Sequence, residues 1–308
     1  MQENNWTLVN EFFLLGFKAN HNMRLFLFSL LLIVYNASIC GNLLIIALVS
    51  TSKNLHTPMY FFISQLSITD ILLISDIVPN IFYIVLNNGV FITFFKCMAQ
   101  LYFFCIAEAC ECLLLAVMSY DRYVAICKPL HYISIMTGTL CWKLAVIIWF
   151  ISFSFTFIHV KVILRLKFCG PNIIDHLFCD LVPLQDISCS DTFPIKLSIY
   201  FLSIPLMIIP GIIIVISYGN VVRAILQISS NVSRQKVFST CSSHLTVVSI
   251  FYFVIFIVYF VPTKRQSSDV NKILSLLYTV FTPLVNPIIY SFRNKDIRKA
   301  VQETFQSV

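Results

Sequence analysis

Residues 97–122 read CMAQLYFFCIAEACECLLLAVMSYDR, and this stretch decides the fold. It is almost wholly apolar, yet it contains two glutamates and ends in the charged pair Asp121-Arg122. On an α-helix, which turns about 100° per residue, one stripe within about 40° of a single line collects Phe104, Glu108, Glu111, Leu115, Met118 and Arg122. Each charge turned towards lipid would cost about 2.5 kcal/mol or more, so this stripe is expected to face the interior of a helix bundle.

The composition of the whole chain is that of an integral membrane protein. Its 308 residues are 58% hydrophobic and 11% charged, and the mean hydropathy is +0.86. Soluble domains have roughly 45–50% apolar and 25% charged residues. Apolar runs of about 20 residues are long enough to span a bilayer as helices and too long for the strands of a membrane barrel. Seven such segments can be drawn, at 25–49, 59–86, 97–120, 141–160, 197–222, 238–261 and 271–291.

These segments predict an all-α membrane protein with a seven-transmembrane helix bundle. Its expected parts are an extracellular tail at 1–24, the bundle at 25–291, and a cytoplasmic part at 292–308 with a short amphipathic helix. Basic residues are nearly equal on the two sides and do not decide the orientation. The sequon at Asn5 and the cysteine-bearing loops share one side, which favours an extracellular N-terminus, a cytoplasmic C-terminus and glycosylation of Asn5. The first twenty residues lack the pattern of a cleavable signal, so the first helix is expected to act as its own signal.

Four cysteines are distinguished by their place in the expected loops. Cys97 opens the third helix, and Cys169, Cys179 and Cys189 lie in the long loop before the fifth. A disulfide from this loop to the third helix would fold the loop over the mouth of the bundle, but spacing alone leaves three pairings open. A zinc site is the alternative, although no CxxC pair or close histidine spacing supports one, and no transition metal is expected.

Two carboxylates are expected to meet in the middle of the membrane. Asp70, on the second helix, lies at a depth similar to that of Glu111, with Asn42 and Asn286 as plausible neighbours. Apposed carboxylates must share a proton or hold a cation. The alternative is a polar network that only fixes helix packing. The sequence contains no HExxH, P-loop, GxSxG or intramembrane-protease GxGD motif, and we expect no enzyme activity.

Several motifs occur in a characteristic order. They are GNLL at 41–44, LHTPMYFFISQLSITD at 55–70, MSYDRYVAICKPLHY at 118–132, SY at 217–218, KVFSTCSSHLTVV at 236–248 and PLVNPIIYSFRN at 283–294. With these motifs the chain resembles the vertebrate olfactory receptors, a branch of the rhodopsin-like G-protein-coupled receptors, from about residue 12 to 303. The resemblance implies a receptor that binds small, mostly hydrophobic volatile odorants and activates a stimulatory, olfactory-type G protein to raise cAMP. It also implies a multi-pass protein of the plasma membrane, in contact with lipid and not nucleic acid, in the cilia of olfactory sensory neurons.

The resemblance assigns roles to individual positions. Cys97 would pair with Cys179, and Cys169 with Cys189. Asp70, Glu111, Asn42 and Asn286 would form a site for Na⁺. Activation and G-protein coupling would depend on Asp121, Arg122, Tyr123, Tyr218, His244, Tyr252, Asn286, Pro287 and Tyr290, with Asp121 holding Arg122 in the inactive state.

The chain departs from the wider receptor pattern at the sixth helix. Arg234 lies near the position where many relatives carry an acid that locks the arginine, so His244 is a candidate replacement. Tyr252 and Val254 stand where the wider family has a Trp-Pro pair. Activation details from other receptors therefore do not transfer directly.

The ligand pocket is expected in the outer half of the bundle, beneath the tethered loop. Its candidate residues are Phe104, Cys105, Glu108, Ala109, Leu202, Ser203, Leu206, Ile255, Phe256, Tyr259, Leu276 and Thr279. Glu108 would contact an amine or another hydrogen-bond donor, or it would instead join the network of Asp70 and Glu111. An ion-coupled transporter or channel using the same carboxylates is the alternative function, and a non-signalling adhesion or chaperone role is another. A conduction pathway would favour repeated halves, which the sequence lacks.

Overall fold

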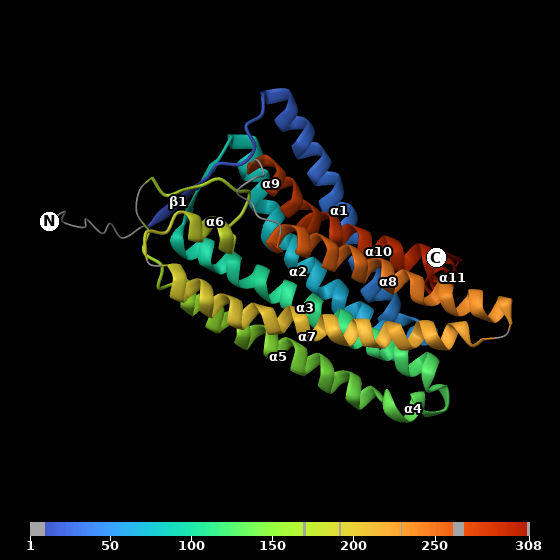
Figure 1. Ribbon diagram of the computed structural model, residues 1–308. Helices are drawn as coiled ribbons and strands as arrows, with labels where there is room; N and C mark the ends of the chain where they lie inside the picture. The colour runs from blue at the N-terminus through green and yellow to red at the C-terminus, as the bar shows by residue number, and fades with distance from the viewer. Residues whose placement is uncertain (1–9, 169–170, 191, 229, 261–267, 307–308) are drawn as a thin grey trace.

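The computed structural model describes residues 10–168, 171–190, 192–228, 230–260 and 268–306. Asn5 and Cys169 lie outside the described residues, and so does the side chain of Tyr259. Figure 1 shows a helix bundle with strand β1 and helix α6 at one end and helices α4 and α11 at the other. We call these the sheet end and the α11 end.

Long apolar helices build the bundle, as the sequence predicts. Within the described residues, six segments are long and apolar enough to cross a membrane, and α8 adds the shorter apolar stretch Cys241–Ile257. The helices are α1 (His21–Thr51), α2 (Pro58–Asn87), α3 (Phe94–Cys127), α5 (Gly138–Ile163), α7 (Thr192–Leu226), α8 (Asn231–Phe260), α9 (Ser268–Leu276) and α10 (Thr282–Arg293). A π-helical turn, η4 (Leu277–Phe281), joins α9 to α10, so these three form one spanning unit.

Short elements connect the long helices at both ends. They are the 3-10 turns η1 (Lys53–Leu55) and η2 (Pro129–His131) and the helices α4 (Tyr132–Ile135), α6 (Leu181–Asp186) and α11 (Lys295–Gln306). Several long helices run past the expected limits; α3, for example, continues seven residues beyond 120, to Cys127. Their apolar runs mark the stretch suited to lipid, whereas helical hydrogen bonding continues into more polar sequence until a cap or turn stops it.

Local sequence signals fix where the helices begin. The side chains of Asn20, Thr93 and Thr137 each accept a hydrogen bond from a backbone N–H in the first turn of α1, α3 and α5. Helix α2 has Pro58 in its first turn, where the missing N–H costs no helical hydrogen bond. It ends at Asn88, which adopts a left-handed conformation with φ of 57°.

Helix α3 lies at the centre of the bundle and contacts α2, α5, α7 and α8. The face predicted to point inwards does so: Phe104, Glu111, Leu115 and Met118 are all buried. Large apolar side chains elsewhere in the bundle remain exposed, such as Phe150 at 71%. This distribution suits a bundle whose outer surface meets lipid and whose polar groups face inwards.

A three-stranded sheet closes the sheet end, and one of its strands lies within the predicted N-terminal tail at 1–24. The strands β1 (Glu11–Leu14), β2 (Val90–Thr93) and β3 (Ile173–Ile174) lie in the order β2-β1-β3. Strand β1 pairs antiparallel with β2 and parallel with β3. The strands are too short to produce a clear alternating pattern, and their partners lie far apart in sequence, so periodicity alone does not reveal them.

A disulfide and an aromatic cluster hold the long loop against this sheet. Cys97 at the start of α3 is bonded to Cys179, as the resemblance predicts. The ring of Phe12 on β1 lies 5.1 Å from that of Phe168 and 6.0 Å from that of Phe94, measured between centroids. Cys189 is also disulfide-bonded, and its predicted partner lies outside the described residues.

Candidate functional site

A cavity of about 370 Å³ lies between α3, α5, α7, α8 and the loop that carries α6. This volume is within the range of pockets that enclose small organic ligands. Its walls are mostly apolar, with scattered polar groups. The lining residues are Phe104, Cys105, Glu108, Ala109, Cys112, Phe155, Thr156, His159, Asp180, Leu181, Val182, Gln185, Tyr200, Ser203, Ile204, Leu206, Met207, Ile208, Phe251 and Ile255.

The structure separates the sequence-predicted pocket residues into two groups. Those that line this cavity are Phe104, Cys105, Glu108, Ala109, Ser203, Leu206 and Ile255. Among the described side chains, four candidates lie outside its walls: Leu202, Phe256, Leu276 and Thr279. Phe256 is 57% exposed on the outer surface of α8, and the buried hydroxyl of Thr279 donates to the carbonyl of Ser275.

Sequence reasoning missed two whole groups of wall residues, as well as six single residues on helices from which it chose others: Cys112, Tyr200, Ile204, Met207, Ile208 and Phe251. One group comes from α5, where Ser152, Thr156, His159 and Ile163 are all buried on one face. Polar residues at this helical spacing within an apolar run are a usable signal that the face turns inwards. The other group comes from the loop and α6, from Asp180 to Gln185. The bond between Cys179 and Cys97 helps to hold this loop over the bundle, and the sequence alone left that pairing open.

Two carboxylic acids and one histidine lie in the cavity wall. The Oε1 atom of Glu108 and the Nε2 atom of His159 are buried and have no hydrogen-bond partner among the described residues. Asp180 is 3% exposed, and its Oδ1 atom accepts a 2.6 Å hydrogen bond from the N–H of Leu181 at the start of α6. Burial raises the pKa of Asp180 to about 6. The cavity thus combines apolar surface with unsatisfied polar groups that a ligand can engage.

A buried polar cluster joins α2, α3 and α10. The side-chain amide of Asn286 donates to both carboxylate oxygens of Asp70, at 3.2 and 3.1 Å, and to Oε1 of Glu111 at 3.4 Å. Asp70 and Glu111 are 1% and 2% exposed. One amide group carries only two hydrogens for these three oxygens. The two buried carboxylates therefore share a single amide donor, which cannot satisfy all three oxygens fully.

Asn42 does not join this cluster through a hydrogen bond. Its amide instead donates to the carbonyls of Ser38, at 3.0 Å, and Pro283, at 2.9 Å. The Oδ1 atom of Asn42 is buried and has no hydrogen-bond partner among the described residues. Its buried amide satisfies backbone carbonyls of α1 and α10 and fixes these two helices to each other.

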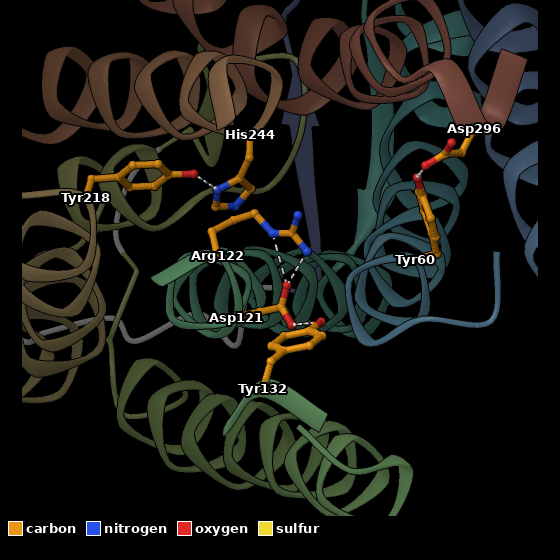
Figure 2. Close-up of polar contacts among 7 residues, drawn as sticks. All are labelled: Tyr60, Asp121, Arg122, Tyr132, Tyr218, His244 and Asp296. Carbon is orange, nitrogen blue, oxygen red and sulfur yellow. Dashed lines mark hydrogen bonds and ion pairs between the residues drawn. The ribbon is translucent and has the colours of Figure 1, made fainter. Parts of the chain in front are cut away.

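A second polar cluster lies towards the α11 end, where α3 carries Asp121 and Arg122 (Figure 2). The Nε and Nη2 atoms of Arg122 both donate to Oδ2 of Asp121, the first at 3.0 Å. The Oδ1 atom of Asp121 accepts a 2.8 Å hydrogen bond from the hydroxyl of Tyr132 on α4. Burial and the neighbouring Asp121 raise the pKa of Tyr132 above its ordinary value. Asp121 therefore binds Arg122 and the loop after α3 at once.

The side chains of α7 and α8 meet next to this arginine. In Figure 2 the imidazole of His244 lies close to Arg122, and a dashed line joins it to the hydroxyl of Tyr218. That contact, between the hydroxyl oxygen and Nδ1, is 2.5 Å long, and the two rings are stacked. Arg234 is occupied elsewhere, because its Nη2 atom donates to the carbonyl of Ile228. His244, and not an acid, is therefore the α8 side chain beside the arginine.

The family model for olfactory receptors matches residues 30–307. The chain belongs to the olfactory receptor family. Olfactory receptor 13A1 of Homo sapiens is 43% identical over 301 residues, covering 98% of this chain and 92% of that protein. Olfactory receptor 2W1 of Homo sapiens is 41% identical over 303 residues, covering 98% and 95% respectively. Olfactory receptor 5G9 of Mus musculus is 41% identical over 304 residues, covering 99% and 97%. The chain is therefore a multi-pass membrane protein and not an enzyme.

In this olfactory receptor, one side chain connects the cavity wall to α8. The hydroxyl of Tyr252 lies 3.3 Å from the sulfur of Cys112, a residue of the cavity wall. The same sulfur donates to the carbonyl of Leu206 on α7. A ligand that moves Cys112 would therefore act on contacts to two further helices.

The remaining predicted switch residues of the receptor are Tyr290, Pro287 and Tyr123. The hydroxyl of Tyr290 is buried and has no hydrogen-bond partner among the described residues. Pro287 lies so close to Gly41 on α1 that a Cβ there would be 3.2 Å from the proline ring. Tyr123 is half-buried, and Lys128 lies over its ring. Figure 2 also shows Tyr60 of α2, whose hydroxyl donates to Asp296 at the start of α11.

Proposed function

We propose that this protein is an odorant receptor that binds small, mostly hydrophobic volatile molecules in the described cavity. Occupancy of the cavity activates a stimulatory, olfactory-type G protein and raises cAMP. The observation that carries the proposal is that α3 lines the cavity with Glu108 and Cys112 and carries the Asp121–Arg122 pair closer to its other end. A single rigid helix thus connects a ligand-sized space at one end of the bundle with a charged switch at the other.

The lining of the cavity supports a ligand held mainly by burial. Aromatic and aliphatic side chains such as Phe155, Met207 and Ile255 form most of the wall. Removing apolar ligand surface from water contributes about 25 cal/mol per Å². A few polar groups then fix the orientation of the ligand.

The α11 end supports an inactive arrangement of the switch. Arg122 is paired with Asp121, and Tyr218 contacts His244 instead of the arginine. In the proposed active state Arg122 leaves Asp121 and meets Tyr218 and the end of the G-protein α-subunit, while Tyr290 moves into the same region. The buried, unsatisfied hydroxyl of Tyr290 supports its part, because such a group gains a partner when it moves.

We also propose a bound Na⁺ at Asp70 and Glu111, with Asn286 as a neighbour. Two carboxylates served by one amide would be satisfied by a cation between them, and oxygen ligands suit such a hard ion. The ion would favour the present packing of α2, α3 and α10. Helix movement that separates the carboxylates would weaken its binding, which connects the ion to the receptor state.

The proposed location is the plasma membrane of the cilia of olfactory sensory neurons, with the sheet end outside and the α11 end in the cytosol. The disulfide between Cys97 and Cys179 supports this orientation, because such bonds persist in oxidising surroundings. The same orientation places Asp121 and Arg122 where a G protein can reach them.

The decisive experiment is a chemically diverse odorant screen in cells with a cAMP readout, followed by nucleotide exchange on the purified olfactory G protein. Arg122→Ala is expected to abolish agonist-dependent exchange while cell-surface expression persists. Agonist-dependent exchange that survives Arg122→Ala would contradict the proposed switch. Ligand or ion flux without exchange would support the transporter or channel alternative.

A further inference from the structure

The ligand cavity has an acidic lining with no opposite charge in its wall. Glu108 projects from α3, and Asp180 precedes α6 in the loop. Among the described lining residues there is no lysine or arginine, and His159 is the one basic side chain. The two acids belong to different elements that fold together over the same space, so the acidic character of the wall is created by the fold.

A buried lysine at this end of the bundle is already engaged. The buried Lys272 on α9 forms an ion pair with Asp175 and donates a 2.7 Å hydrogen bond to the carbonyl of Gly16. The Oδ1 atom of Asp180 accepts from a backbone N–H, whereas Oε1 of Glu108 accepts from no described donor. A buried carboxylate oxygen without a donor is destabilising unless the group is neutral or meets a partner. Glu108 is therefore the side chain through which a ligand can gain most.

We propose that the cavity selects small primary alkyl amines, bound in their ammonium form with Glu108 as the counter-ion. This inference rests on the proposed function and names its ligand class. The ammonium group donates to Glu108 and to the unpartnered nitrogen of His159, while Asp180 adds favourable charge from the loop. The alkyl chain packs against Phe104, Phe155 and Phe251. Alkyl amines are protonated at neutral pH, as lysine is with a pKa of about 10.4. An alcohol of the same length fills the same space but brings no charge.

Binding to purified full-length receptor in detergent tests the selection directly. The probes are hexylamine and hexan-1-ol, and the readout is the ligand-dependent shift in melting temperature across a concentration series. We expect hexylamine to bind at least about tenfold more tightly than hexan-1-ol, because a charge-assisted hydrogen bond is the stronger interaction. Equal binding of the two probes, or no binding of hexylamine, would overturn the inference.

Variants assign the preference to the named side chain. Glu108→Gln keeps the size and removes the charge, so hexylamine should bind at least about tenfold more weakly while hexan-1-ol changes less than about threefold. Asp76→Asn is the matched control: this acid is half-buried in α2, lies outside the cavity wall, and has an oxygen without a described partner. Asp76→Asn should leave the binding of both hexylamine and hexan-1-ol unchanged. If Glu108→Gln does not fold, Asp180→Asn should reduce hexylamine binding selectively; an unchanged preference in the folded variant overturns the assignment.

Functional readouts separate the two proposals. Hexylamine binding with the predicted variant pattern, but without nucleotide exchange, would keep the amine site and overturn the signalling proposal. Activation of cAMP by neutral odorants while hexylamine fails to bind would keep the receptor function and overturn the amine site.

Discussion

The hydroxyl of Tyr132 donates a 2.8 Å hydrogen bond to one carboxylate oxygen of Asp121, while the other oxygen holds Arg122. The loop after α3 is thus bonded to the same group that restrains the arginine. A G protein that displaces this loop would weaken the restraint as well. Asp121 is 0% exposed, so water does not readily replace either partner.

Replacing this carboxylate should activate the receptor without ligand. We expect Asp121→Asn to raise basal nucleotide exchange several-fold, because an amide binds the guanidinium much less strongly than a carboxylate does. Basal cAMP, normalised to receptor at the cell surface, is the measurement. A basal signal at or below that of the unmodified receptor would contradict the restraint.

Tyr132 should have a smaller effect in the same direction. Tyr132→Phe removes one hydrogen bond, worth about 0.5–1.5 kcal/mol, but leaves the ion pair in place. Basal exchange should therefore rise about twofold to tenfold, and less than in Asp121→Asn. Tyr120→Phe is the control, because Tyr120 is exposed on α3 and should leave the basal signal unchanged. Equal effects of the two tyrosine variants would show that loop bonding to Asp121 is not the cause.

Sodium should stabilise the receptor through its central carboxylates. In 150 mM NaCl, compared with the same concentration of choline chloride, we expect the free energy of unfolding to rise by about 2–3 kcal/mol. This rise would be seen as a melting temperature several degrees higher. Glu111→Gln and Asp70→Asn should each abolish this difference. Asn42→Ala should lower the melting temperature in both salts and preserve the difference, because Asn42 bonds backbone carbonyls and not the carboxylates. A sodium effect that persists in Glu111→Gln would rule out the site.

Acid should weaken the sheet end through His176. Its ring nitrogens contact the carbonyl of Phe178 and the hydroxyl of Ser275, and burial lowers its pKa from 6.5 to about 4. Because the folded pKa lies below the unfolded one, the unfolded state binds more protons between these values. Stability is therefore complete above about pH 6.5 and falls by a few kcal/mol as the pH drops towards 4. Between pH 7.5 and 4.5, the melting temperature of the receptor should fall more steeply than that of His176→Gln, because the variant lacks the titrating group. Curves that stay parallel would refute this role.

Much of the membrane-embedded core could be predicted from sequence, since lipid imposes strong rules on it. Hydropathy located the spanning helices, and charge on one face of α3 showed that this face turns inwards. Asp70 and Glu111 are at similar depth in the membrane by sequence, which predicts that they approach each other. In the structure, Asn286 hydrogen-bonds to both. Asn42 is buried on α1, and its amide donates to backbone carbonyls. Membrane depth and helical spacing do not reveal whether a buried amide will bond to side chains or to the backbone.

The pocket was predicted less completely, for reasons that lie in the backbone. Leu276 lies just before a π-helical turn and Thr279 lies within it, and such a turn departs from the regular 100° spacing of an α-helix. The wall formed by α5 depends on which face of an almost uniformly apolar helix turns inwards. The contribution of Asp180 depends on a disulfide whose pairing the sequence leaves open. These features are set by tertiary packing and not by local pattern.

The sheet has a consequence for how the receptor is made. Strand β1 is synthesised early, but β3, one of its two partners, is synthesised roughly 160 residues later. At about 5–20 residues per second, the ribosome needs about 8–30 s to cover that distance. During this interval one edge of β1 has unpaired backbone groups and is open to chaperones. The edge of β1 that pairs with β3 is therefore completed only after more than half of the chain has been translated.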